Sequence, residues 1–293
     1  MARSIPYPTG RLALAGLLLG LATLTTPLHA APLEEIQERG VIRIAVANER
    51  PYGYLNAEGK ALGVGPEVAH HLIDELGIER IEWLATDFDD LIPGLEEGRF
   101  DMAAAEMAIR PGRCERVLFS EPNTSYGEGL LVLASNPHQL DAYEDFAERT
   151  DSLKVAVQAG TVQEEIFDRL GVDPSRILTL EGPQEAIDAL VRGQADAFAA
   201  TGLTVSSLEE MSPEVQAEFN FKDPIVDGRE VRYWGGFTFP LDADDLRAAV
   251  NDALKDYKRT DDWEQTLTRY GFLKKDILYS FRFDTRRLCG DQE

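Results

Sequence analysis

The feature that most constrains this chain is the alternation of apolar strand segments with amphipathic helices, which continues along nearly its whole length. The stretch "VIRIAVA" predicts a buried strand, and "GPEVAHHLIDELG" predicts an amphipathic helix that Gly77 ends. The alternation continues as far as the long helix predicted at "DADDLRAAVNDALKDYKRT". This rhythm predicts an α/β fold with open sheets.

The rhythm is interrupted once, at "NPHQ", after which a second α/β unit begins. The later strand "YWGGFTF" predicts a return to the first unit, so that the last helices join it. We therefore expect two lobes connected by two crossing strands, "GLLVLA" and "YWGGFTF", that form a hinge. Lobe 1 would hold residues 31–134 and 240–293, and lobe 2 residues 135–239. A ligand cleft is expected between them, beyond the carboxyl ends of the strands.

The first thirty residues predict a secretory signal peptide that is separate from the fold. Arg3 and Arg11 form a basic start, "LALAGLLLGLATL" is an apolar segment too short for a comfortable membrane span, and "LHAAP" offers cleavage after Ala30. The alternative is a retained N-terminal anchor, which the charged sequence beginning at Glu34 disfavours. No later stretch is apolar enough to cross a bilayer, so we expect a periplasmic protein.

Charge and cysteine content narrow the possible functions. Two of the 29 basic residues and none of the 52 acidic residues belong to the predicted leader, so the remainder has a net charge of −25. This excludes electrostatic binding to nucleic acid or an anionic membrane as the main function. Cys114 and Cys289 suggest one disulfide in an exported chain, and two separate thiols are the alternative. No metal-site or phosphate-loop pattern is present, so we expect no metal or cofactor.

Six motifs spread over nearly the whole chain after the leader carry a family resemblance. They read "VIRIAVANERPYGY", "GVGPEVAHHLIDELG", "LIPGLEEGRFDMAAAEMAIRPGRCERVLFSEP", "VAVQAGTVQEE", "EAIDALVRGQADAFAAT" and "WGGFTF". Together they resemble the extracellular solute-binding proteins of ATP-binding-cassette (ABC) importers, in the class that handles polar amino acids. "ANERPYGY", "PGRCERVLFSEP" and the late "LC" are most similar to the branch that binds ectoine or 5-hydroxyectoine.

The resemblance implies a type II periplasmic-binding-protein fold and a function in transport without catalysis. The protein would be a monomer that binds a small zwitterionic ligand in the cleft between its lobes. It would then deliver that ligand to the membrane permease subunits of the importer.

The resemblance also implies where the ligand carboxylate is held. Arg113, in "RPGRC", would grip it, which suits a guanidinium with two parallel donors. Thr161 follows "QAG" at the start of a predicted helix, where backbone N–H groups and a hydroxyl can hold an anion. Gly160 would allow the ligand to approach closely. A surface arginine and an ordinary helix-capping threonine are the structural alternatives.

The lack of an aspartate that amino-acid binders usually have constrains the other end of the ligand. Amino-acid binders of this class usually end the "ADA" strand with an aspartate that holds the α-ammonium, whereas Thr201 stands at that place here. An unpaired ammonium in a closed cleft is costly, so we expect a carboxylate ligand without a primary α-ammonium. Ectoine, a cyclic amidinium with one carboxylate, fits this description.

The ectoine branch implies an aromatic cage around the delocalised cation. Tyr52 and Phe88 would supply aromatic faces. Glu49 would accept hydrogen bonds from the amidinium, and the adjacent Asn48 would add a polar contact. Ordinary core packing of both rings, and a solvated loop position for Glu49, are the alternatives.

Two positions depart from the ectoine branch. Ala108 stands where that branch has a third aromatic residue, and we expect Trp234 to replace the missing wall, with packing at the hinge as the alternative. Glu106 stands where a small residue is expected. Its carboxylate either binds the ligand or is turned out of the cleft.

Two rival functions remain open. The first is a polar L-amino-acid binder in which Glu49 or Glu106 replaces the missing aspartate. The second is an enzyme, because some proteins of this fold resemble dehydratases or cell-wall lytic enzymes that use a cleft carboxylate as acid or base. Glu106 is the candidate for that role, and no second catalytic group can be named.

Overall fold

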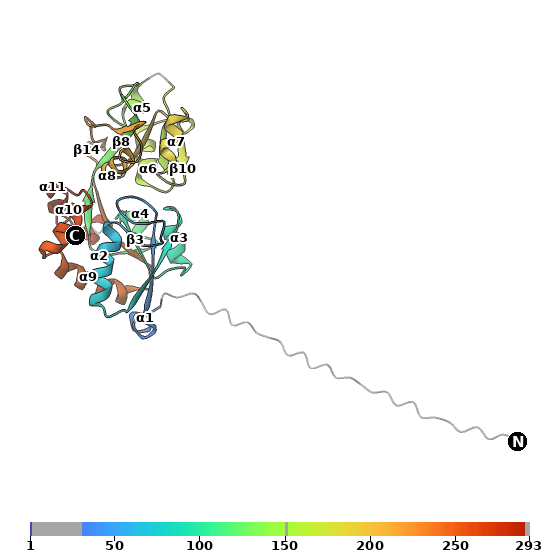
Figure 1. Cartoon of the computed structure of the whole chain (residues 1–293), viewed down its shortest axis with the longest axis vertical. Helices are drawn as coiled ribbons and strands as arrows, with labels where there is room; N and C mark the ends of the chain where they lie inside the picture. The colour runs from blue at the N-terminus through green and yellow to red at the C-terminus, as the bar shows by residue number, and fades with distance from the viewer. Residues whose placement is uncertain (2–30, 150–151, 291–293) are drawn as a thin grey trace.

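The structure is a computed structural model that describes Met1, residues 31–149 and residues 152–290. These residues form two α/β lobes, each with its own central sheet (Figure 1). Residues 2–30 of the predicted signal peptide, including the cleavage site, lie outside the described residues. Within the described ranges, no helix is both long and apolar enough to cross a membrane.

Lobe 1 is built on a six-stranded sheet. Its strands are β1 (Val41–Val46), β4 (Arg80–Ala85), β5 (Met102–Ala108), β6 (Leu118–Phe119), β7 (Thr124–Tyr126) and β15 (Tyr233–Phe239). The order is β4-β1-β5-β15-β6, and β7 also pairs with β15. β1 is parallel to β4 and β5, whereas β15 is antiparallel to its neighbours. A short hairpin, β2 (Tyr54–Leu55) and β3 (Ala61–Leu62), follows β1.

Apolar clusters lie on both faces of this sheet, because alternate side chains of a strand point to opposite faces. Ile42 and Ile44 belong to one cluster, and Ala45 belongs to the other. The lobe 1 helices are α1 (Leu33–Arg39), α2 (Val64–Glu75), α3 (Leu91–Glu96), α4 (Pro111–Cys114), α9 (Asp244–Tyr257), α10 (Asp261–Arg269), α11 (Lys274–Tyr279) and α12 (Thr285–Leu288). In α9, acidic residues occupy the first turn and Lys255 the last turn, and both interact favourably with the helix dipole.

Lobe 2 has a five-stranded sheet that is also covered on both faces. Its strands are β8 (Glu128–Leu133), β9 (Val155–Gln158), β10 (Ile177–Leu180), β11 (Ala197–Thr201) and β12 (Val215–Ala217), with a separate hairpin of β13 (Ile225–Val226) and β14 (Arg229–Glu230). The order is β10-β9-β11-β8-β12, and β9 is parallel to β10 and β11. Its helices are α5 (Asp145–Glu148), α6 (Val162–Leu170), η1 (Pro174–Arg176), α7 (Glu185–Val191) and α8 (Gly202–Glu209).

The chain crosses between the lobes twice, between β7 and β8 and between β14 and β15. The expected boundaries at residues 134 and 239 therefore differ from the structure by about one strand each. β8 pairs within the lobe 2 sheet, and β15 pairs within the lobe 1 sheet. The physical reason is that the apolar pattern of a strand does not reveal which sheet it joins. The expected two-lobed α/β architecture itself agrees with the structure.

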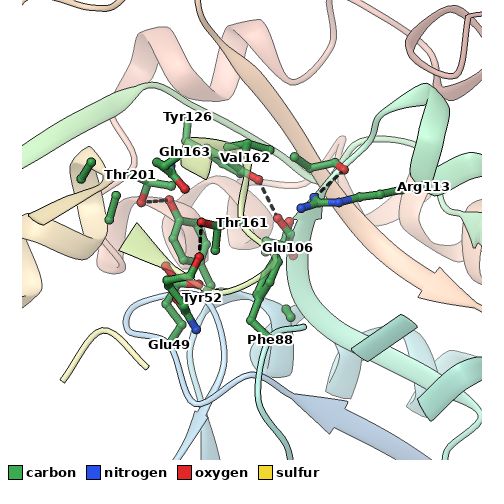
Figure 2. A pocket seen from close by; sticks show the side chains of 15 residues that line it. Glu49, Tyr52, Phe88, Glu106, Arg113, Tyr126, Thr161, Val162, Gln163 and Thr201 are labelled. Carbon is green, nitrogen blue, oxygen red and sulfur yellow. Dashed lines mark hydrogen bonds between the residues drawn. The ribbon is translucent and has the colours of Figure 1, made fainter. Parts of the chain in front are cut away.

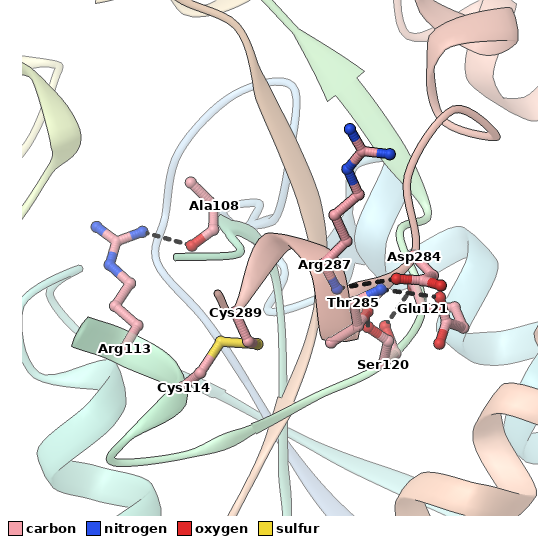
Figure 3. The surroundings of a disulfide bond; sticks show 9 residues. All are labelled: Ala108, Arg113, Cys114, Ser120, Glu121, Asp284, Thr285, Arg287 and Cys289. Atoms are coloured by element: carbon pink, nitrogen blue, oxygen red, sulfur yellow. Dashed lines mark hydrogen bonds between the residues drawn. A yellow bond between two sulfur atoms is a disulfide. The ribbon is translucent and has the colours of Figure 1, made fainter. Parts of the chain in front are cut away.

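A disulfide ties the carboxyl-terminal segment to lobe 1 (Figure 3). Cys114, at the end of α4, is bonded to Cys289, with a Cα–Cα distance of 5.7 Å. Thr285 adds two hydrogen bonds nearby, because its N–H donates to Glu121 Oε2 (3.1 Å) and its hydroxyl donates to the Ser120 carbonyl (2.6 Å). The segment is thus held against the turn that carries Arg113.

Candidate functional site

A cavity between the two lobes collects side chains from beyond the carboxyl ends of parallel strands, as in other open α/β sheets (Figure 2). Glu49 and Tyr52 follow β1, Arg113 follows β5, and Thr161 follows β9. Lobe 1 contributes Glu49, Tyr52, Phe88, Ala105, Glu106, Ala108, Arg113 and Tyr126, and lobe 2 contributes Gln158, Thr161, Val162, Gln163, Ala199, Ala200 and Thr201.

The loop that carries Glu49 and Tyr52 is held by close backbone packing. Glu49 and Gly53 exchange two backbone hydrogen bonds of 3.0 and 2.9 Å, and the Gly65 N–H donates to the Tyr52 carbonyl (2.9 Å). A Cβ atom at Gly53 would lie 2.5 Å from the Ala104 carbonyl oxygen, so β5 leaves room only for glycine there. The positions of both site residues therefore follow from how this loop packs on β5.

One end of the cavity, called here the arginine end, consists of Arg113, Phe88, Thr161 and the N-terminus of α6. The Arg113 guanidinium donates to the carbonyls of Ala108 (3.1 Å) and Gly160 (2.9 Å). It lies 5.5 Å from the centre of the Phe88 ring. Burial of the guanidinium lowers the pKa of Arg113 to about 10. Among the described residues, Arg113 has no carboxylate as an ion-pair partner.

The start of α6 lies at the same end. The Thr161 hydroxyl donates to the Gln158 carbonyl (2.7 Å), and in the described part of the chain the Thr161 side chain does not cap the helix. The first N–H groups of a helix need acceptors and favour negative charge. The arginine end therefore combines a partly buried guanidinium with a helix N-terminus, which is an arrangement that suits a carboxylate.

The opposite end, called here the glutamate end, consists of Glu49, Tyr52, Tyr126 and Thr201. Glu49 is only 7% exposed, and its Oε1 accepts a hydrogen bond from the Thr204 hydroxyl (2.6 Å). Burial raises the pKa of Glu49 to about 7, and the bond from Thr204 opposes this rise. No arginine, lysine or histidine of the described residues forms an ion pair with Glu49.

Aromatic rings form one wall of the glutamate end. The Tyr52 and Tyr126 rings lie 5.3 Å apart. The Tyr52 hydroxyl donates across the cleft to Thr201 Oγ1 (2.7 Å), and the Tyr126 hydroxyl donates to the Glu106 carbonyl (2.8 Å). This end therefore places a buried carboxylate beside aromatic faces, which suits a cation.

Glu106 lines the cavity, but its carboxylate is engaged within lobe 1. Oε1 accepts from Asn123 Nδ2 (2.7 Å), and Oε2 accepts from the Thr124 hydroxyl (2.7 Å). Burial raises the pKa of Glu106 to about 7, and these two bonds oppose the rise. Each oxygen of the Glu106 carboxylate therefore already has a partner within lobe 1.

The sequence profile of the bacterial extracellular solute-binding proteins, family 3, matches residues 42–274. The chain belongs to this family. A probable amino-acid ABC transporter periplasmic-binding protein of Sinorhizobium fredii is 42% identical over 97% of this chain and 94% of that protein. Membrane-bound lytic murein transglycosylase F of Photobacterium profundum is 26% identical over 66% of this chain, but this match covers only 38% of that protein.

Solved structures of solute-binding proteins share the fold. The crystal structure of EhuB in complex with hydroxyectoine has a TM-score of 0.79 and 27% identity, and the match covers 89% of this chain and 98% of that one. An ancestral amino-acid-binding protein, described as a precursor of cyclohexadienyl dehydratase, has a TM-score of 0.69 and 28% identity over 81% and 98% of the two chains. The fold of this family 3 protein is thus the two-lobed type II binding-protein fold.

Most of the ligand-binding residues expected from the sequence lie around the cavity of this family 3 protein. Those that line it are Glu49, Tyr52, Phe88, Glu106, Arg113, Thr161 and Thr201. Three other expected residues, Asn48, Gly160 and Trp234, do not line it. Asn48 is exposed, and its carbonyl accepts from Gln184 Nε2 of lobe 2 (3.0 Å). Gly160 contributes its carbonyl to Arg113 from outside the cavity lining.

Trp234 is the clearest correction to the sequence-based site. Its indole N–H donates to the Tyr279 carbonyl (2.7 Å), and its ring lies 4.8 Å from the Phe283 ring. Trp234 therefore packs against the carboxyl-terminal segment and does not line the cavity. Its contacts agree with the alternative of packing near the hinge. Tyr126 lines the cavity as a further aromatic residue, which is the position that had been expected for Trp234.

Several site residues had not been expected. Tyr126, Gln158, Val162 and Gln163 line the cavity. Thr204 bonds to Glu49 from behind the lining. Tyr126 had one available signal, since it precedes the first crossing strand. Thr204 had another, because it follows Thr201 by three residues, which is the spacing of a helix N-cap and its third helical position.

No group of three or more His, Cys, Asp or Glu residues in the described part of the chain could hold a metal ion.

Proposed function

We propose that this family 3 protein is the periplasmic binding component of an ABC importer, and that its ligand is ectoine or 5-hydroxyectoine. The observation that carries the proposal is that two charged side chains, the partly exposed Arg113 and the buried Glu49, lie at opposite ends of one cavity (Figure 2). Neither has an ion-pair partner among the described residues. Removing one partner of a buried charge pair is strongly destabilising, so a ligand with complementary charges would stabilise the closed cleft.

The required ligand is a small zwitterion. Its carboxylate would accept the fork of donors on Arg113, together with the N-terminal N–H groups of α6 beside Thr161. Its cation would lie next to Glu49. An anionic or a cationic ligand alone would leave one of these two charges unpaired.

The form of the cation separates ectoine from an amino acid. Tyr52 and Tyr126 present aromatic faces beside Glu49, which favour a delocalised planar cation. Thr201, a neutral residue, occupies the end of β11, where the resembling amino-acid binders place a carboxylate. EhuB, whose crystal structure is a complex with hydroxyectoine, shares the fold over nearly its whole length, which adds support.

Transport requires the cleft to open and close around the ligand. Bonds across the cleft include Arg113 to the Gly160 carbonyl and Gln184 to the Asn48 carbonyl. A ligand shifts such an equilibrium only through its preference for the closed form. We infer that the closed, loaded monomer docks to permease subunits in the membrane. The disulfide supports an oxidising compartment such as the periplasm, which a cleaved signal peptide would reach.

A polar L-amino acid is the second candidate ligand. The relative from Sinorhizobium fredii, whose name assigns it to amino-acid transport, favours it. Glu49 could then hold the α-ammonium in place of the missing aspartate. A dehydratase-like activity is disfavoured, because both carboxylate oxygens of its candidate residue, Glu106, already accept hydrogen bonds.

Calorimetric titration of the mature protein tests the proposal. Ectoine, 5-hydroxyectoine, L-glutamine, L-histidine and L-arginine would be titrated at high salt. Saturable binding of ectoine or its hydroxyl derivative without a response to the amino acids is the expected result, and Tyr52→Ala should weaken it. Binding only to amino acids would replace the proposed ligand by the second candidate.

A further inference from the structure

Four hydroxyl and carboxyl groups form one hydrogen-bonded relay that crosses the cleft twice. The Tyr52 hydroxyl of lobe 1 donates to Thr201 Oγ1 of lobe 2 (2.7 Å). Thr201 Oγ1 lies 3.0 Å from Thr204 Oγ1. The Thr204 hydroxyl then donates back to Glu49 Oε1 of lobe 1 (2.6 Å). Thr201 and Thr204 belong to the N-terminus of α8, which rests on lobe 2.

The direction of the relay follows from counting protons. Thr201 Oγ1 already accepts from the Tyr52 hydroxyl and from the Thr204 N–H (3.2 Å), so its own proton is available to Thr204 Oγ1. A hydroxyl has one proton to donate, and Thr204 donates its proton to Glu49. Every bond therefore points towards the Glu49 carboxylate. Such a chain ends in a charge-assisted bond and favours an ionised acceptor.

The relay leaves Glu49 incompletely satisfied. Thr204 occupies Oε1, and the residue is almost fully buried and lines the cavity. A buried carboxylate is stable only when it is paired and hydrogen-bonded. The remaining oxygen thus calls for a donor from the ligand, and a ligand without a cationic donor would leave it unmatched when the lobes close.

We propose that Thr204 is a specificity-determining positioning residue: it acts through Glu49 and makes closure of the cleft depend on a positive charge in the ligand. In the open form, Thr204 would separate from Glu49 together with lobe 2. In the closed form it fixes Glu49 as an oriented, ionised acceptor. This inference rests on the proposed function to the extent that the ligand is a zwitterion, and it does not depend on which zwitterion is bound.

A double-mutant cycle with ectoine as the titrant tests the inference. Thr204→Val removes the hydroxyl but keeps the branched shape and the backbone N–H that Thr201 caps. A hydrogen bond to a charged group justifies an expected loss of affinity of about tenfold or more. In a Glu49→Gln background the acceptor is neutral, and Thr204→Val should then cost no more than about threefold. Thr204→Ser should restore the affinity, because it retains the donor.

Ser206 supplies a matched control on the same helix. Its hydroxyl donates to the Gly202 carbonyl (2.9 Å), it is not buried, and it does not line the cavity. Ser206→Ala should leave the affinity unchanged. An equal loss from Thr204→Val in both the wild-type and the Glu49→Gln backgrounds would mean that Thr204 is merely structural, and would overturn the inference. Failure of Thr204→Ser to restore binding would do the same.

The outcomes also separate this inference from the proposed ligand. If the wild-type protein binds an α-amino acid instead of ectoine, the ligand assignment fails, and the cycle is repeated with that amino acid. If Thr204→Val weakened binding of that amino acid in the wild-type background but not in the Glu49→Gln background, the role of Thr204 would still be supported. A protein that binds neither class of zwitterion would overturn both.

Discussion

The arginine end and the glutamate end of the cavity are assembled differently. At the arginine end, Arg113 lies within α4 and Thr161 lies at the start of α6, each in a short sequence motif. The glutamate end brings together Glu49, Tyr126 and Thr204, which belong to three distant segments and to both lobes. A local motif can position a guanidinium or a helix N-terminus, whereas a buried carboxylate needs partners that only the closed tertiary structure supplies.

The largest expected effect is a loss of stability when the disulfide that anchors the arginine end is removed. Cys114 and Cys289 are 175 residues apart, and the chain-entropy model assigns about 5 kcal/mol to a loop of this length. Replacing both residues by Ser should lower the free energy of unfolding by up to that amount, as measured by urea denaturation. The affinity should fall as well, because Cys114 adjoins Arg113. A double variant as stable as the oxidised wild-type protein would contradict the prediction.

Arg113→Ala should have the largest effect on binding. Loss of one partner of a buried charge pair costs about 4 kcal/mol, or roughly 1000-fold in affinity. Arg113→Lys should recover only part of the loss, because an ammonium cannot reproduce the bidentate fork. Both would be measured by calorimetric titration with ectoine.

Arg116→Ala is the control for the arginine end. Arg116 is exposed and pairs with Glu96, away from the cavity. Its replacement should leave the affinity within about twofold of the wild type. If Arg116→Ala weakened binding as much as Arg113→Ala, a non-specific loss of basic charge would explain both.

Another buried carboxylate, Glu128, sharpens the contrast with Glu49. Glu128 lies behind the cavity lining, where Oε2 accepts from Gln163 Nε2 (2.5 Å) and the Tyr143 hydroxyl (3.0 Å). Oε1 has no hydrogen-bond partner among the residues that the structure describes. Burial raises the pKa of Glu128 to about 7. This residue therefore carries the cost of burial without access to the ligand.

Glu128→Gln should stabilise the protein at alkaline pH. A raised pKa in the folded state means that the wild-type protein loses stability as the pH rises from about 4.5 through 7, because the unfolded chain gives up this proton first. The gain should reach at most about 3 kcal/mol at pH 8 and vanish below pH 4.5, as measured by thermal denaturation. The same gain should appear with and without ligand.

The control for Glu128 is Glu96, where the sign is opposite. Its hydrogen bond with Arg116 lowers the pKa of Glu96, so Glu96→Gln should not stabilise the protein at pH 8. A stabilising effect of similar size at both positions would point to relief of the overall negative charge, and the burial argument for Glu128 would be wrong.

Glu49→Gln tests the glutamate end directly. The amide keeps the shape and the acceptor for Thr204 but removes the charge, so ectoine affinity should fall about 30-fold, or about 2 kcal/mol. A neutral analogue of the ligand ring should lose much less. Titration of both compounds measures the difference, and equal losses would show that Glu49 recognises shape and not charge.

The sequence predicted the arginine end better than the glutamate end, and the reason is physical. Arg113 and Thr161 could be proposed because the family resemblance marks both within short contiguous motifs, "RPGRC" and "VAVQAGTVQEE". Tyr126 was missed because its role depends on β7 pairing with β15, and Trp234 was misplaced because its contacts come from the carboxyl-terminal segment. The two-lobed fold could be predicted from the alternation of strands and helices. The exact points at which the chain crosses between the lobes could not, because the sequence of a strand does not reveal which strands it pairs with.

The smallest expected effect concerns the aromatic wall that replaces Trp234. Tyr126→Leu should reduce ectoine affinity about fivefold, or about 1 kcal/mol, because a cation beside an aromatic face gains energy of that order. Tyr126→Phe keeps the ring and loses only the hydroxyl bond to the Glu106 carbonyl, so it should bind nearly as well as the wild type. Trp234→Phe should leave the affinity unchanged, since Trp234 faces the Phe283 ring and not the cavity. A loss of affinity in Trp234→Phe that exceeds the loss in Tyr126→Leu would reverse the assignment and return Trp234 to the ligand cage.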